Sequence, residues 1–214
     1  MERSVHSSGE EFLLPLFPLG VVLFPGSSLP LHIFEDRYKV LIAESLDAGS
    51  LFGINMVNEG KVATIGCTAR VSTVLKRYED GRMDVVVGGK DRFALGSLDE
   101  KGRPYIVGRA SLFITHDEKI DAGLASETIQ LYNELIEKAF ESRIPFQQFN
   151  PEDSEISFVL AQKAGLSLLQ RQQILETPKE NDRLLLLRDH LRDLLPKLEQ
   201  ARDLSRVVQN DGYL

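Results

Sequence analysis

Two residues of this 214-residue chain could take part in nucleophilic chemistry, a histidine and the only cysteine. His32 lies in an apolar run between Leu31 and Ile33, and Cys67 lies in a stretch rich in β-branched residues. Nucleophilic catalysis needs a base and an orienting group arranged around the nucleophile. Neither residue has such a pattern beside it, so we expect both to be structural. A hydrolytic site near His32 and Cys67 stays open as an alternative.

Sequence patterns for cofactors and metals are weak. Gly88-Gly89-Lys90 follows a predicted strand, but no amphipathic helix comes after it, as it would in a phosphate-binding loop. The sequence contains no Gly-x-x-x-x-Gly-Lys-Ser/Thr segment. The other histidines, His6, His116 and His190, lack the short spacing of metal ligands. We therefore expect no cofactor, no metal site and no catalytic residue in this chain.

The charge balance argues against a nucleic-acid binder. The formal net charge is −7, of which −1 falls on residues 1–115 and −6 on residues 116–214. Nucleic-acid binding proteins usually carry a basic surface. No run reaches the roughly 18–20 apolar residues that cross a bilayer. A single cysteine forms no intrachain disulfide, which favours a reducing, cytoplasmic location. Residues 1–11 lack an apolar core and are predicted to be a loose tail.

The positions of these residues depend on an apolar, proline-rich stretch at residues 14–38. Its four prolines rule out a helix and predict short extended pieces joined by turns. A helix is predicted over residues 35–48, because apolar residues there recur at helical spacing before a glycine. Several strands follow, with a hairpin turn at residues 78–82 centred on Asp-Gly. Strands with glycine bends at this spacing favour a small twisted barrel over residues 12–115.

Residues 116–214 have the pattern of a helical subdomain. Capping boxes at Ser167-x-x-Gln170 and Thr177-x-x-Glu180 each predict the start of a helix. The last helix carries an apolar ladder with alternating spacing of three and four residues: Leu184, Leu187, Leu191, Leu194, Leu198 and Ala201. This ladder packs either against the chain's own helices or against a second copy in a homodimer. Pro196 is expected to kink or break the helix.

Aromatic side chains are the candidate binding groups, because a small barrel hides only some of them. Most are expected in the core, and those left exposed would suit an extended apolar peptide. A cleft between barrel and helices would bring in the aromatic residues of the linker at residues 144–149. The candidate peptide-binding residues are Phe17, Phe34, Tyr38, Phe52, Phe146 and Phe149.

Several segments together resemble the LON domain, the amino-terminal substrate-recognition domain of the ATP-dependent Lon protease. The resemblance starts with Leu14-Pro15-Leu16-Phe17-Pro18-Leu19, Phe24-Pro25-Gly26 and Leu29-Pro30-Leu31-His32-Ile33-Phe34-Glu35. It continues through Ile65-Gly66-Cys67-Thr68-Ala69-Arg70-Val71 and Gly89-Lys90-Asp91-Arg92-Phe93, and ends with the helical segment 166–176. It covers about residues 12–195 as one LON domain.

The resemblance implies an α+β fold, with a PUA-like β-rich pseudo-barrel carrying one helix, followed by a helical bundle. It also implies recognition of unfolded or apolar polypeptide segments, or of a partner protein. Full Lon adds an ATPase module and a protease module with a Ser–Lys dyad, and neither is present in these 214 residues. We therefore expect a non-catalytic, stand-alone binding module that does not act on membranes. RNA binding, which PUA folds often perform, is a second alternative to the hydrolase.

Overall fold

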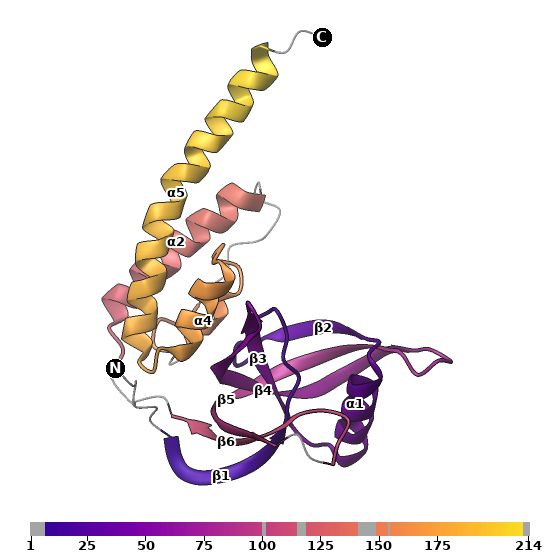
Figure 1. Cartoon of the computed structure of the whole chain (residues 1–214). Helices are drawn as coiled ribbons and strands as arrows, with labels where there is room; N and C mark the ends of the chain where they lie inside the picture. Colours follow the sequence, from indigo (N-terminus) through magenta and orange to yellow (C-terminus); the bar gives the residue numbers. More distant parts are fainter. Residues whose placement is uncertain (1–6, 100–101, 115–118, 141–148, 154, 212–214) are drawn as a thin grey trace. The chain divides into compact units, whose positions relative to one another are not determined.

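The computed structural model describes residues 7–99, 102–114, 119–140, 149–153 and 155–211 (Figure 1). The chain forms two compact units. The first unit contains residues 1–116 and 167–178, and the second contains residues 117–166 and 179–214. Residues 167–178, which the sequence analysis places in the helical subdomain, group with the strands in the first unit.

The first unit is built on a six-stranded antiparallel sheet, in which five strands follow the order β1-β6-β5-β4-β3 and β2 pairs with β5 off this path. Its strands are β1 (Ser7–Pro15), β2 (Ser28–Ile33), β3 (Phe52–Asn58), β4 (Lys61–Arg77), β5 (Met83–Asp99) and β6 (Val107–Phe113). β1 begins at Ser7, inside the segment predicted to be a loose tail. Prediction failed there because pairing with β6, which is remote in sequence, orders residues that have little apolar character of their own.

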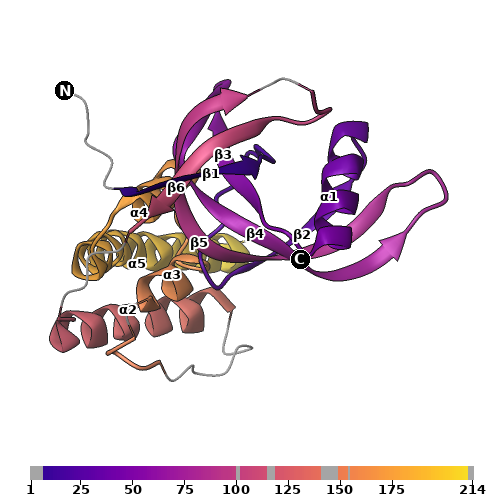
Figure 2. The ribbon, with the colours of Figure 1, turned by 90° about the horizontal axis from the view of Figure 1, so that it is seen from below.

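The sheet closes on itself through the segment that follows β1. The Phe17 N–H donates to the Gly53 carbonyl at 2.7 Å, and the Leu19 N–H donates to the Asn55 carbonyl at 3.0 Å. This segment therefore covers the free edge of β3, and the strands curve into the small barrel that the glycine spacing predicts (Figure 2). Glycines permit the tight curvature, since a Cβ at Gly53 would lie 2.6 Å from the ring of Phe93.

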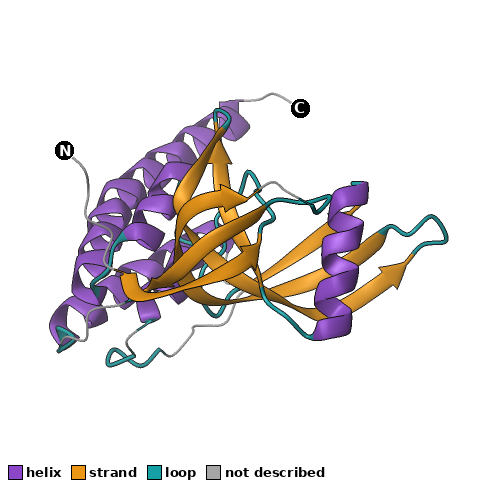
Figure 3. Cartoon of the chain, turned by 60° about the horizontal axis from the view of Figure 1, so that its bottom comes forward, coloured by secondary structure: helices purple, strands orange, loops and turns teal. Residues whose placement is uncertain are grey.

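β2, the first part of β5 and the end of β4 form a three-stranded layer. β5 lies in the middle, with β2 on one side and β4 on the other. Helix α1 (Asp36–Ala48) follows β2 and crosses these strands (Figure 3). It buries Tyr38, Leu41 and Ile42 against the barrel core and ends at Gly49, whose φ of 60° is left-handed. Both the helix and its glycine end match the sequence prediction.

Helix α4 (Leu168–Glu176) belongs to the first unit. It starts at the predicted capping box, where Ser167 and Gln170 bond to each other's backbone. The Gln172 amide donates to the Ile65 carbonyl of β4 at 2.9 Å. Arg92 of β5 donates to the carbonyls of Leu175 and Thr177 at 2.9 and 2.8 Å, just where the helix ends. A buried arginine thus ties the end of α4 to the barrel.

The second unit contains α2 (Ala122–Phe140), α3 (Ile156–Ala161) and α5 (Glu180–Asp211). α5 continues through Pro196, so the predicted break does not occur. Leu184, Leu187 and Leu191 are fully buried in the unit, so this part of the ladder packs within the chain itself. The Glu180 carboxylate bonds to Ser157 and to Arg183, and α5 begins at Glu180, three residues after the predicted cap residue Thr177. In the described residues, no helix combines the length and apolar character needed to cross a membrane.

Candidate functional site

The structure separates the six predicted peptide-binding residues. Phe17, Tyr38 and Phe52 are buried in the barrel core, with the rings of Phe17 and Tyr38 stacked at 3.9 Å. Phe149 is half-buried in the second unit, where its ring meets Tyr132 edge-on. Phe146 lies outside the described residues. Only Phe34, which is 60% exposed, is open to a ligand among the five that the structure describes.

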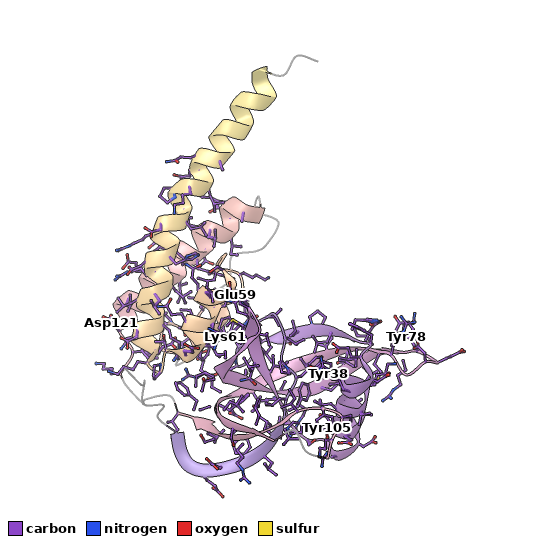
Figure 4. All side chains as sticks on the ribbon, in the orientation of Figure 1. Tyr38, Glu59, Lys61, Tyr78, Tyr105 and Asp121 are labelled. Atoms are coloured by element: carbon purple, nitrogen blue, oxygen red, sulfur yellow. The ribbon has the colours of Figure 1, made fainter. Side chains whose placement is uncertain are left out.

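Phe34 belongs to a group of three aromatic side chains, His32, Phe34 and Tyr78, which we call the ring cluster. The His32 ring lies 6.0 Å from Phe34, roughly parallel to it, and 5.9 Å from Tyr78, nearly perpendicular. Strand alternation explains why His32 and Phe34 share a face, because they are two residues apart. Tyr78 lies in the β4–β5 hairpin and is labelled in Figure 4. The ring cluster thus joins β2 to the hairpin on the outer face of the layer.

Asp84 holds the ring cluster in place. Its two carboxylate oxygens bond to His32 Nδ1 at 2.6 Å and to the Tyr78 hydroxyl at 2.7 Å. The His32 bond, followed by the Tyr78 bond, lowers the pKa of Asp84 below its usual value. The hydrogen bond that the Tyr78 hydroxyl donates to this carboxylate raises the pKa of the hydroxyl, because ionisation would break the bond. Asp84 therefore stays ionised and the phenol stays neutral over a wide pH range.

Cations surround the outer side of the cluster. The Lys76 ammonium lies 4.4 Å from the centre of the Tyr78 ring, and the Arg82 guanidinium lies 5.0 Å from it. A hollow of about 360 Å³ lies beside Tyr78, between α1 and the hairpin, with Val40, Ala43 and Met83 among its lining residues. The outer face of the layer therefore offers exposed rings with a cationic margin, whereas the hollow opens on the face of the layer that α1 covers.

A second cavity, of about 350 Å³, lies under α1 on the side of β1 and β6. Its lining is mostly apolar and includes Leu41 and Phe52. Glu44 also lines it and bonds both to Arg103, at 2.8 Å, and to the Tyr105 hydroxyl. Burial, followed by the Glu44 bond, raises the pKa of Tyr105. Because Arg103 and Glu44 neutralise each other, this cavity suits an uncharged group, but its polar side chains are already paired.

The residues of the alternative hydrolytic site are not brought together. Cys67 is fully buried and lies opposite Arg92 of β5, whereas His32 lies opposite Asp84. Asp84 and Arg92 are eight residues apart on one strand that rises about 3.3 Å per residue. Neither side chain can therefore act directly on the other. Among the described residues, no group of three or more His, Cys, Asp or Glu side chains is placed to hold a metal ion.

Sequence reasoning missed Asp84, and it assigned Tyr78 only to a turn. Their roles depend on the β2–β5 register, which places Asp84 opposite His32. A usable signal did exist for Phe34. Leu29, Leu31 and Ile33 alternate with Ser28, Pro30 and His32, so the same alternation places Phe34 on the outer face.

Comparison with known proteins gives a consistent result. The profile of the ATP-dependent protease La (LON) substrate-binding domain matches residues 13–193. The chain is 34% identical over 117 residues to the Lon protease of Parabacteroides distasonis, covering 50% of the chain and 14% of that protein. It is 23% identical over 221 residues to Lon protease 2 of Syntrophobacter fumaroxidans, covering 94% of the chain and 28% of that protein. The chain thus spans less than a third of these curated relatives.

Solved structures with a similar fold carry the same family name. A Lon N-terminal domain protein from Xanthomonas campestris superposes with a TM-score of 0.66 at 25% identity, covering 82% of this chain and 96% of that one. The N-terminal domain of a Mycobacterium avium complex Lon protease superposes with a TM-score of 0.65 at 21% identity, covering 85% and 99%. This second likeness is one of fold alone.

Proposed function

The chain belongs to the ATP-dependent protease La (LON) substrate-binding domain family, and from this premise we propose that it binds apolar segments of polypeptide chains at the ring cluster. The observation that carries this proposal is the 60% exposure of Phe34 within a cluster held in place by Asp84. A large ring exposed in a fixed position is the kind of group that anchors protein interfaces.

The surroundings of the ring cluster support a polypeptide ligand. Aromatic rings bury large areas with little loss of side-chain entropy, so the exposed rings of the cluster suit an apolar side chain of the ligand. Lys76 and Arg82 would form the polar margin that surrounds the apolar centre of most interfaces. We assign no catalytic step to this chain, and we place its binding activity in the cytoplasm.

RNA binding is the alternative class of function. The ring cluster contains rings on which bases could stack, with two cations beside them. Against this, the Asp84 carboxylate lies within the cluster, and the whole chain has a net charge of −7. An RNA complex would weaken steeply with salt, whereas binding of an apolar peptide would change little. A titration at two salt concentrations therefore separates the two classes.

The test is the binding of fluorescently labelled β-casein, an unfolded protein, to the purified chain. We expect Phe34→Ser to weaken binding about tenfold, the effect of losing roughly 1.4 kcal/mol at an interface anchor. Leu169→Ser is the matched control, because Leu169 is 61% exposed and lies on α4, which packs at a different part of the barrel. Thermal unfolding of both variants checks that they are folded. Equal binding by the two variants would refute the ring cluster as the binding site.

A further inference from the structure

One edge of β2 is open. Among the described residues, β2 is paired only with β5, on one side. The other edge presents backbone N–H and C=O groups to solvent, and such an edge can accept a further strand. Which residues supply these groups follows from the register of the pair.

Two hydrogen bonds define the direction of each backbone group. The Gly89 N–H donates to the Ser27 carbonyl at 2.8 Å. The backbone N–H and C=O groups of Ser27, and of every second residue after it, therefore point toward β5. Independently, the Val86 carbonyl accepts a bond from the Ser72 hydroxyl of β4 at 2.9 Å, so the backbone groups of Val86 point away from β2. Pro30 lies opposite Val86 in the β2–β5 pair, so the backbone carbonyl of Pro30 points away from β5.

The open edge is thus formed by Ser28, Pro30 and His32. All three side chains are exposed, and Phe34 continues the same alternation into the ring cluster. The edge presents three carbonyl acceptors but only two N–H donors, because proline has none. The missing N–H donor is that of Pro30, the middle residue of the open edge.

Resting on the function proposed above, we propose that the bound polypeptide adds to the sheet as an extra strand along the open edge of β2. Ser28 and His32 each exchange two hydrogen bonds with the ligand backbone, and Pro30 accepts one. The ligand continues past His32, so that an apolar side chain packs against Phe34. This recognition depends on backbone groups and one apolar contact, which fits a binder of varied unfolded segments.

Pro30 also weakens pairing of β2 with a second copy of this chain. In the register that pairs the whole open edge, a twofold axis places Pro30 opposite Pro30, and the central pair then has no donor at all. Another polypeptide loses only one bond there, because its own N–H still reaches the Pro30 carbonyl. Proline on an edge strand is a known protection against pairing between identical chains.

The test uses the full chain and a labelled seven-residue peptide of alternating threonine and valine with a central phenylalanine. A series of peptides carries a single N-methyl group on each backbone amide in turn. Binding should weaken only at every second position, because only those peptide N–H groups point toward β2. In the protein, hydrogen exchange at the amides of Ser28 and His32 should be fast without peptide and slow with it. The amides of Leu29 and Leu31, which face β5, should exchange slowly in both states.

Pro30→Ala adds the missing donor and should tighten peptide binding by roughly three- to tenfold, as expected for one further hydrogen bond. Pro104→Ala is the control, because Pro104 is exposed in a loop away from β2. Strand addition would be overturned if N-methyl groups did not weaken binding at alternate positions and if the amides of Ser28 and His32 gained no protection from hydrogen exchange. If binding still depended on Phe34, the proposed function would stand. Absence of binding by the unmodified peptide would overturn both.

Discussion

Replacing Arg92 by methionine should release helix α4 from the barrel. The Arg92 guanidinium is buried, lies 4.7 Å from the centre of the Phe113 ring, and donates to the carbonyls of Leu175 and Thr177. These two charge-assisted bonds, two of those that Arg92 makes to this segment, contribute about 1.5–3 kcal/mol each, or about 3–6 kcal/mol together before the structure relaxes. Water reaching the freed carbonyls recovers part of this, and single substitutions rarely exceed about 4–5 kcal/mol. We expect a loss of about 3–4 kcal/mol in the free energy of unfolding of the first unit.

The chain contains no tryptophan, so urea unfolding is best followed by circular dichroism together with hydrogen exchange of individual segments. In Arg92→Met, protection should fall in α4 and β5 but not in α2 or α5, which belong to the other unit. Arg70→Met, an exposed arginine of β4, is the control and should change stability by less than about 0.5 kcal/mol. Equal effects of the two substitutions, or an equal loss of protection in both units, would refute the role given to Arg92.

Two further predictions concern charged groups. Arg183→Met leaves the Glu180 carboxylate buried without its cation and should cost about 3–5 kcal/mol, measured by urea unfolding, whereas the exposed Arg192→Met should cost far less. Because its bond to His32 lowers the pKa of Asp84, the stability contributed by this carboxylate is present above its ordinary pKa of 3.8 and is lost as the pH falls through the lower folded value. The carboxyl carbon of Asp84, followed by nuclear magnetic resonance, should therefore titrate with a midpoint below 3.8; a midpoint at or above 3.8 would contradict the bond.

Local patterns predicted the elements well, because each depends on neighbouring residues. The prolines of residues 14–38, the glycine end of α1 and the capping box of α4 all act within a few positions. Pro196 shows the limit of such a rule, since packing of α5 outweighs one lost bond. The classification of α4 as part of the helical subdomain also failed, because the bonds from Arg92 span more than 80 residues and leave no local pattern.

The candidate site was predictable only in part. Phe17 and Phe34 lie in the same apolar stretch, yet one is buried against Tyr38 and the other is exposed. Composition alone could not separate them, whereas alternation along β2 does. Asp84 and Tyr78 join the site only through the pairing of β2 with β5, which sequence spacing does not encode.

The assignment of residues 167–178 to the first unit has a consequence for biosynthesis. A ribosome adds residues in order, so strands β1–β6 emerge long before α4, and residues 117–166 of the other unit are made in between. Until residue 178 has left the exit tunnel, the Ile65 carbonyl and the Arg92 side chain lack the partners that α4 supplies. Completion of the barrel during translation must therefore wait until residue 178 has been synthesised and has left the exit tunnel.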